Sequence, residues 1–276
     1  MSVRVTNDPA EFKATVFPFL EKDPVLHTVL LSNVQDRATG VLADPSPPVF
    51  VSVHAANGQV VGGSMRTPGR GIFLGGLADA LVSAVVDAFA AAAPEADVVE
   101  GTATAARLFA EEWSSRFGKE YKETRGSRLH KLERFVEQQA DGSPRQAAKA
   151  DVALCVQWMD AFGVDVGMPS PSDHSLIEAR VELGRLWLWE MEGQPVCLVG
   201  HQATVFGSTR VGPVYTPSEH RGHGYASALT AFVSRRILDR GSAACLYTDL
   251  ANPTSNKIYA AIGYEPVADF VRYDFS

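Results

Sequence analysis

The chain has 276 residues, of which 46% are hydrophobic and 21% charged, and its formal net charge at pH 7 is −7. This length is comfortable for two globular domains. The acidic charge argues against nucleic acid as the main partner, because phosphate contacts need clustered Lys and Arg. No apolar run reaches the roughly 20 residues that a membrane span requires, and residues 1–9 lack the apolar core of a signal peptide. We therefore expect a cytoplasmic protein that binds neither nucleic acid nor membranes.

The three cysteines are scattered along the chain at Cys155, Cys197 and Cys245. Their odd number and irregular spacing fit a reducing compartment and match no disulfide or metal pattern. Each lies among apolar residues, which favours a buried structural cysteine over a nucleophile. We expect no bound metal.

The first half of the sequence alternates between helical and extended patterns. Residues 1–33 have a helical pattern, with Asp8 as an N-cap before Pro9, and a second helical piece falls around residues 25–34. The pattern then predicts strands at 49–55 and 59–66, a glycine-rich loop at 69–76, a helix at 77–93, a strand at 98–101, a helix at 102–116 and an extended segment at 121–132.

Residues 136–150 are polar and contain a Gly-Ser-Pro sequence, which predicts a linker between two halves. The second half begins with a helix from Asp151, a loop at 162–172 and a helix at 174–183 capped by Ser172 or Asp173. The pattern further predicts strands at 185–191, 195–206, 210–216, 246–250 and 266–275, with a helix after the turn at 220–225 and another at 252–263.

The turn after the strand at 210–216 has the features of an anion-binding site. Gly222 and Gly224 lack a Cβ, so a phosphate could approach the backbone closely. The helix that follows presents unpaired N–H groups and the positive end of its dipole. Two glycines alone do not establish such a site, because a tight strand–helix turn without a ligand explains them equally well.

The spacing in this turn carries more information than the glycines. Arg221-x-x-Gly224-x-Ala226 resembles the pyrophosphate-binding signature of the GNAT superfamily, the acyl-CoA-dependent N-acyltransferases. It differs from the dinucleotide-binding fingerprint and the P-loop, because the third glycine and the Gly-Lys-Ser/Thr ending are both missing.

A second match follows in the expected order. Asn252, Ser255 and Tyr259 fit the superfamily's Asn-x-x-(Ala/Ser)-x-x-x-Tyr-x-x-x-Gly-(Phe/Tyr) motif, which Gly263 and Tyr264 complete. On a helix the first three residues face one side, and Gly263 suits the helix C-terminus. The resemblance covers roughly residues 144–276.

The resemblance implies an α/β fold, in the broad sense that includes α+β, made of tandem GNAT-like folds. Each would be a mixed, mostly antiparallel sheet flanked by helices, with splayed central strands in the C-terminal half. The first half parallels this order of elements without its motifs. We therefore predict a degenerate GNAT-like domain at 1–138 and a catalytic acetyltransferase domain at 139–276, with an unrelated α/β cap as the alternative for the first half.

The resemblance also implies a set of residues that bind acyl-CoA, with acetyl-CoA as the expected co-substrate. The strand before the turn would pair with the pantetheine amides, the turn would hold the pyrophosphate, and Asn252 would bond pantetheine. The expected cofactor-binding residues are Val214, Tyr215, Thr216, Arg221, Gly222, His223, Gly224, Tyr225, Ala226, Asn252 and Ser255.

Two catalytic roles follow from the chemistry of acyl transfer. Tyr259 is placed to protonate the departing CoA thiolate; the alternative is a helix tyrosine whose hydroxyl reaches solvent. A base must accept the proton of the attacking ammonium. Glu190, next to Trp187 and Trp189 in the sequence, is the first candidate, and His201 is the next. Glu219 and His220 flank the turn and could orient it.

The resemblance implies an N-acetyltransferase that transfers the acyl group by direct attack in a ternary complex, without a covalent acyl-enzyme. The acceptor would be a small-molecule or peptide amine, and the protein a monomer or homodimer. A different class of function stays open: a non-catalytic acyl-CoA sensor or interaction protein that kept the pyrophosphate turn. The sensor would bind acetyl-CoA without turnover.

Overall fold

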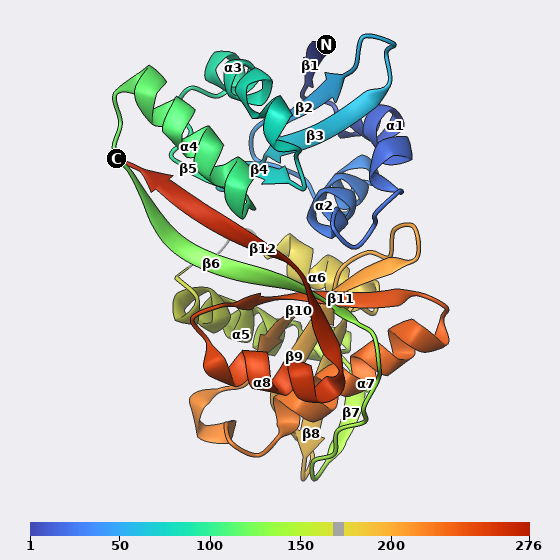
Figure 1. The fold of residues 1–276 in the computed structure, drawn as a ribbon. Coiled ribbons are helices and arrows are strands. Elements are labelled where there is room, and N and C mark those ends of the chain that lie inside the picture. Colours follow the sequence, from blue (N-terminus) through green and yellow to red (C-terminus); the bar gives the residue numbers. More distant parts are fainter. Residues whose placement is uncertain (168–173) are drawn as a thin grey trace. The chain divides into compact units, whose positions relative to one another are not determined.

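The computed structural model describes residues 1–167 and 174–276 (Figure 1). These residues form two compact units, each made of segments that are distant in sequence. The first unit comprises residues 1–129, 248–252 and 266–276, and the second comprises residues 130–247 and 253–265. The division of the chain into domains at residues 138 and 139 stays a prediction.

The sheet of the first unit is completed by the C-terminal strand. Its strand order is β1-β2-β3-β4-β5-β12, in which only β4 and β5 are parallel. The register of β12 against β5 runs from Phe270–Thr102 to Asp274–Val98. The strands are β1 (Ser2–Thr6), β2 (Val49–His54), β3 (Val60–Arg66), β4 (Ile72–Gly75), β5 (Val98–Thr102) and β12 (Tyr264–Phe275).

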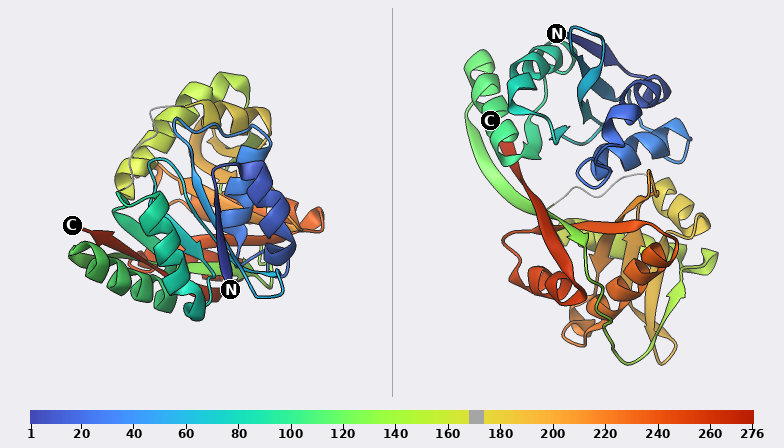
Figure 2. Two further views of the ribbon diagram at one scale, coloured as in Figure 1. Left: turned by 90° about the horizontal axis from the view of Figure 1, so that it is seen from above. Right: turned by 45° about the vertical axis from the view of Figure 1, so that its right-hand side comes forward.

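Helices cover both faces of this sheet, and the alternation of side chains along β2 decides which face each residue serves. Phe50 stacks on Phe12 of α1, with ring centroids 4.8 Å apart, whereas Val49 and Val51 join the core under α3 and α4. Figure 2 shows α1 and α2 on the opposite side of β2 and β3 from α3 and α4. The helices are α1 (Pro9–Leu20), α2 (Thr28–Ala38), α3 (Val82–Ala92) and α4 (Ala103–Phe117).

The second unit repeats this plan with strands in the order β11-β10-β9-β8-β7, in which only β10 and β11 are parallel. Its strands are β7 (Ser143–Gln146), β8 (Leu186–Met191), β9 (Gln194–His201), β10 (Ser208–Tyr215) and β11 (Ala243–Asp249). Its helices are α5 (Val152–Asp165), α6 (Ser175–Glu182), α7 (Tyr225–Asp239) and α8 (Pro253–Ile262). The remaining strand, β6 (Tyr121–Leu132), has its residues up to 129 in the first unit.

Alternation again separates two cores in the second unit. Trp187 and Trp189 of β8 pack in the core formed with α7 and α8. Leu186 and Leu188 of the same strand pack with α5 and α6 instead. The glycine turn before α7 therefore lies at the start of a helix that is anchored on one face of the sheet.

The structure corrects four sequence-based expectations. Residues 2–6 form strand β1 rather than helix, because Val3 and Val5 alternate with polar residues and pair with β2. Residues 72–75 form buried strand β4 rather than loop. The predicted linker contains strand β7, whose polar side chains suit the edge of a sheet, and α5 continues to Asp165 into the predicted loop.

The fold class is confirmed as a mixed, mostly antiparallel α/β structure in two halves of similar plan. Asp8 caps α1 as expected, since its carboxylate accepts the N–H of Ala10 at 2.7 Å. The proposed capping residues Ser172 and Asp173 of α6 lie outside the described residues. Among the described helices, none combines the length and apolar character needed to cross a membrane.

The position of β12 predicts that the C-terminal strand stabilises the first unit. Phe270 is fully buried and its ring lies 6.1 Å from that of Phe73. Phe270→Ala should lower the free energy of unfolding by about 3–5 kcal/mol, because it leaves a cavity in the core. Hydrogen exchange should accelerate in β4 and β5 before it does in β9.

The matched control is Val267→Ala on the same strand, where the side chain is 44% exposed. Urea denaturation should give a change within about 0.5 kcal/mol for this variant. Equal destabilisation by both substitutions would contradict the assignment of Phe270 to the core of the first unit.

Candidate functional site

The site begins where β10 separates from β11. Their parallel register covers only Ser208–Ala243, Thr209–Ala244 and Arg210–Cys245. Beyond these pairs, β10 continues to Tyr215 with β9 as its partner, through a bulge between Val211 and Val214. Pro213 has no N–H with which to extend a ladder. The β11-facing edge of residues 211–215 is therefore left without a paired strand among the described residues, which is the splay expected of the central strands.

The turn after β10 is built by two glycines in left-handed conformation. Gly222 has φ +85° and Gly224 has φ +81°, values that glycine adopts without strain. Gly224 occupies the N-cap position of α7, and residues 221–224 are exposed. The first N–H groups of α7 therefore follow an exposed turn in which Gly222 and Gly224 carry no side chain, while His223 between them stacks on Tyr225. This geometry fits a phosphate group.

Arg221 does not extend over the helix N-terminus. Its Nε donates to the Thr216 carbonyl at 2.9 Å, and its Nη2 bonds the Asp165 carboxylate at 2.7 Å. The guanidinium thus ties the turn to the end of α5, and Asp165 offsets its charge. Both side chains are about half exposed, 53% and 48%, so an incoming anion could compete with Asp165 for Arg221.

The strand residues before the turn point to both faces of the sheet. Tyr215 packs on Trp158 of α5, with ring centroids 6.2 Å apart. Burial raises the pKa of its hydroxyl, and Asp165 adds to the effect. The Thr216 hydroxyl instead donates to the sulfur of Cys197 on β9 at 3.2 Å. Val214 pairs with Val199 and packs against the core formed with α7 and α8.

Tyr259 is a buried side chain, 8% exposed, in the core between α7, α8 and the sheet. Burial raises the pKa of its hydroxyl, and neighbouring Cys197 raises it further. A phenol with a raised pKa keeps its proton throughout the physiological range and is a weaker acid than a free tyrosine. Its burial also speaks against the alternative of a tyrosine that only reaches solvent.

Cys197 lies near both Tyr259 and Thr216. It belongs to the same buried core as Tyr259, and its sulfur accepts a hydrogen bond from the Thr216 hydroxyl. Cys197 is fully buried, and burial raises the pKa of its thiol to about 12. It therefore stays protonated and inert as a nucleophile, as the sequence predicts for a structural cysteine. Together Thr216, Cys197 and Tyr259 connect the end of β10 to the second motif helix.

The remaining cofactor residues lie at the start of α8. Asp249 organises this turn, because its carboxylate accepts the N–H of Ala251 at 2.7 Å and its carbonyl accepts the N–H of Asn252 at 3.0 Å. Ser255 is half-buried in the first turn of α8. The cofactor-binding roles of Asn252 and Ser255 stay predictions. His223 stacks on Tyr225, with ring centroids 5.4 Å apart.

Glu190 is placed differently from the environment expected for it. The neighbouring Trp187 and Trp189 face the core with α7, whereas Glu190 lies on the other face and bonds Arg145 Nε at 2.6 Å. Arg145 also holds Asp151 through two bonds of 2.6 and 2.9 Å. The carboxylate is therefore engaged in a salt bridge and is not enclosed by tryptophans. Its role as general base stays a prediction.

The other base candidates have distinct surroundings. His201 is half-buried at the end of β9, and burial lowers the pKa of its imidazole. Its Nδ1 lies 3.0 Å from the Gln202 carbonyl. Glu219 is exposed, and a backbone hydrogen bond together with Ser218 lowers the pKa of its carboxyl. Among the described residues, no group of three His, Cys, Asp or Glu side chains could hold a metal ion.

The corresponding place in the first unit is closed. The pairing of β4 with β5 runs on to Gly75–Gly101, close to the ends of both strands. A Cβ on Gly101 would lie 2.8 Å from the Leu74 side chain, and one on Gly76 would lie 2.6 Å from that of Leu26. Apolar side chains therefore fill the space next to these two glycines.

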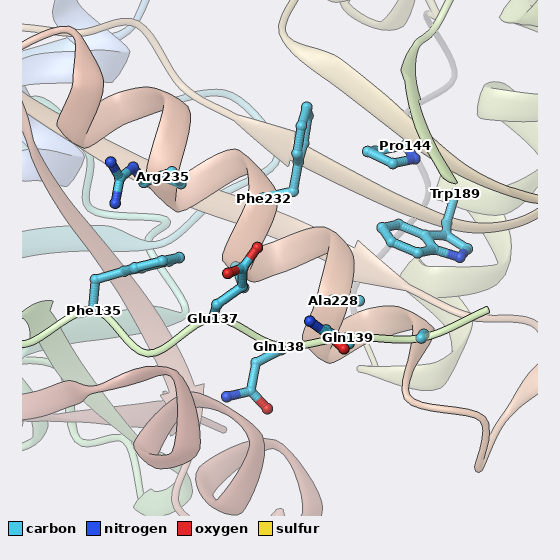
Figure 3. Close-up of a pocket in the computed structure, with 11 residues that line it drawn as sticks. Phe135, Glu137, Gln138, Gln139, Pro144, Trp189, Ala228, Phe232 and Arg235 are labelled. Carbon is cyan, nitrogen blue, oxygen red and sulfur yellow. The ribbon is translucent and has the colours of Figure 1, made fainter. Parts of the chain in front are cut away.

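A hollow of about 660 Å³ lies beside α7, on the side of the chain segment that precedes β7 (Figure 3). Phe135 and Arg235 stand at one end, with the guanidinium 5.6 Å from the ring centroid. Trp189 and Pro144 stand at the other end. The segment continues to the turn, where a Cβ on Gly224 would lie 3.7 Å from the Gln139 carbonyl.

Comparison with known structures defines the class of fold. The chain aligns over 100% of its length with 100% of a GNAT-family acetyltransferase from Colwellia psychrerythraea, at 11% identity and TM-score 0.61. A GCN5-related N-acetyltransferase from Sphaerobacter thermophilus aligns over 99% and 94% of the two chains, at 16% identity and TM-score 0.64. A tandem GNAT protein from the clavulanic acid biosynthesis pathway aligns over 100% and 98%, at 13% identity and TM-score 0.59.

The sequence itself adds a family match within the second half. Residues 193–273 match the family model described as FR47-like protein. No curated protein matches the sequence. The chain therefore has the fold of tandem GNAT proteins, and part of its second half matches the FR47-like model.

Sequence analysis missed several contacts that shape the site. The bond from Arg221 to Asp165 joins residues 56 positions apart, and the packing of Trp158 on Tyr215 joins α5 to β10. A salt bridge between distant positions leaves no periodic signal in one sequence, so these partners could be found only from the folded chain.

The Arg145 cluster predicts an acid-sensitive contribution to stability. The hydrogen bond from Arg145 lowers the pKa of Asp151. Asp151 therefore stabilises the fold above its unfolded pKa of about 3.9, and this contribution is lost as the pH falls through the lower, folded value. Arg145→Gln should reduce the free energy of unfolding by about 1–2 kcal/mol at pH 7, and by less at pH 3.

The control is Arg107→Gln, which breaks an exposed pair with Glu111. Urea unfolding of this variant should differ from wild type by no more than about 0.5 kcal/mol at either pH. An Arg145→Gln effect that stays constant between pH 7 and pH 3 would show that Asp151 does not carry it.

Proposed function

We propose that the protein is an acyl-CoA-dependent N-acyltransferase, with acetyl-CoA as donor and a small-molecule or peptide amine as acceptor. The observation that carries this proposal is the separation of β10 from β11 directly before a left-handed glycine turn at the start of α7. The unpaired edge of β10 and the first N–H groups of α7 therefore follow each other along the chain. Acyl-CoA has a pantetheine arm with two kinds of partner to offer them, because the arm carries amides and ends in a pyrophosphate.

In this proposal, the N–H groups of residues 222–226 hold the pyrophosphate, and the edge of residues 214–216 pairs with the pantetheine amides. A backbone N–H of the same edge polarises the thioester carbonyl. Asn252 and Ser255 contribute from the start of α8. Arg221 exchanges its contact with Asp165 for the phosphate. The tandem GNAT fold of the whole chain and the FR47-like match over residues 193–273 support the same class of substrate.

The chemical step is direct attack of the amine nitrogen on the thioester carbonyl carbon. A base first takes the proton of the ammonium, and Glu190 is the first candidate once Arg145 releases it. The new C–N bond forms, the C–S bond breaks, and Tyr259 gives its proton to the CoA thiolate. The nitrogen then loses its surplus proton, which restores the Tyr259 phenol directly or through water. The position of Tyr259 in the motif that begins at Asn252 supports this role, and its hydroxyl enters the step protonated because burial raises its pKa.

The competing function is an acyl-CoA sensor that binds without turnover. The burial of Tyr259 among Cys197 and Tyr264 is compatible with a purely structural tyrosine. The two functions predict different effects of removing the hydroxyl group of Tyr259. A sensor is indifferent to the loss of the Tyr259 hydroxyl, whereas an enzyme loses rate.

Binding at the turn is tested by Ala226→Glu, which adds bulk and negative charge to the first turn of α7. Titration calorimetry should show acetyl-CoA binding to wild type and a loss of at least about tenfold in affinity for the variant, because one carboxylate repels the phosphates at the helix N-terminus.

Ala103→Glu is the matched control, since it places the same side chain in the exposed first turn of α4. It should bind acetyl-CoA like wild type. Equal affinity of wild type and Ala226→Glu would refute a CoA site at residues 221–226, as would a wild-type protein that does not bind.

Turnover is tested by Tyr259→Phe with free-thiol detection over a panel of amines. Loss of general-acid catalysis should lower kcat by about 10²–10⁴-fold, with little change in KM for acetyl-CoA. Tyr247→Phe, in β11, serves as the control tyrosine. Thiol release by wild type that Tyr259→Phe leaves intact would remove Tyr259 from the reaction, and binding with no thiol release from any amine would favour the sensor.

A further inference from the structure

The segment of residues 133–140, here called the strap, connects β6 to β7 and lies along the two helices that carry the cofactor motifs. Its backbone is fixed to the end of α8, where the N–H of Val136 donates to the Ile262 carbonyl at 2.8 Å. The N–H of Glu133 donates to the Gly263 carbonyl at 3.2 Å. Gly263 has φ +102°, and a Cβ there would lie 1.7 Å from the Arg134 carbonyl, so glycine is required.

The side chain of Gln138 joins the two helices. Ser227, in the first turn of α7, donates from Oγ to Gln138 Oε1 at 3.3 Å. Gln138 Nε2 donates to the carbonyl of Ala261 in α8 at 3.0 Å. A single amide group therefore bonds the start of the helix that follows the phosphate turn and the end of the helix that carries Ser255 and Tyr259.

The neighbouring glutamine makes no such bridge. Gln139 is exposed, and its side chain has no hydrogen bond to the described residues. Figure 3 shows the two side chains leaving the strap in different directions. The backbone at Gln139 and Ala140 nevertheless passes close to the turn, since a Cβ on Gly224 would lie 3.7 and 3.8 Å from their atoms.

We propose that Gln138 is a positioning residue for acyl-CoA binding, which fixes the N-terminus of α7 against α8 by bonding both helices. This inference rests on the proposed function, because it concerns the same site. One ligand must reach the N–H groups of α7 and the polar residues of α8 at once. Holding both helices in place before binding spares the ligand the free energy of ordering them.

The size of the effect follows from the two hydrogen bonds. Each is partly exposed and contributes modestly, so their loss should weaken CoA binding by about three- to tenfold. Because Gln138 does not face the reacting atoms in this proposal, kcat should change less than twofold while KM for acyl-CoA rises. A residue important only for stability would instead leave the affinity of the folded protein unchanged.

The experiment compares Gln138→Ala with Gln139→Ala by CoA titration calorimetry, together with hydrogen exchange of residues 222–229 in the free proteins. Gln139→Ala should match wild type in both. Gln138→Ala should weaken CoA binding three- to tenfold and accelerate exchange in the first turn of α7. Ser227→Ala should weaken binding in the same direction and add little to Gln138→Ala, because both remove the same bond.

Gln138→Met provides a second variant that keeps the length of the side chain without adding charge and loses both hydrogen bonds. It should weaken CoA binding as Gln138→Ala does, and thermal melting shows that the compared proteins are folded. If wild type binds CoA and Gln138→Ala binds it equally well, the positioning role is wrong while the proposed function stands. If wild type itself does not bind CoA, the proposed function fails and the positioning role fails with it.

Discussion

The site depends on the point at which β10 leaves β11. Three residue pairs hold the two parallel strands together, and beyond Arg210 and Cys245 the ladder stops. A strand edge left unpaired inside a sheet must find other hydrogen-bond partners. The turn at Gly222 and Gly224 then directs the chain into α7 with its first N–H groups exposed. The unpaired edge of β10 and the start of α7 are thus joined by one short turn. The bonds from Arg221 to Thr216 and Asp165 hold that turn in place.

The two halves share a plan but only one has this opening. In the first unit, β4 stays paired with β5 to Gly75 and Gly101, and Leu74 and Leu26 fill the adjacent space. In the second unit, β10 separates from β11 after Arg210, and a turn with two left-handed glycines follows. The first unit therefore has the same architecture without this separation. Its contribution to the proposed reaction would come from its surface and not from a second cofactor site.

Each unit uses a segment that the linear sequence assigns to the other half or to a linker. Residues 266–276 complete the sheet and core of the first unit through Phe270 and Tyr273. The strap, which has a linker-like composition, is bonded to α7 and α8 in the second unit. Neither half of the sequence thus forms a complete unit by itself. The strap between the halves is part of the second unit, because it is bonded to two of its helices.

The sequence by itself determined the order of most elements, the Asp8 cap and the GNAT resemblance, because local periodicity, capping and the spacing of Arg221, Gly224 and Tyr259 are all short-range signals. Tertiary structure decided what depends on distant partners. Strands β1 and β7 form because β2 and β8 pair with them. Glu190 turns away from its tryptophans to Arg145, and Arg221 turns to Asp165, because side-chain alternation and long-range charge pairing are fixed only when the sheet assembles.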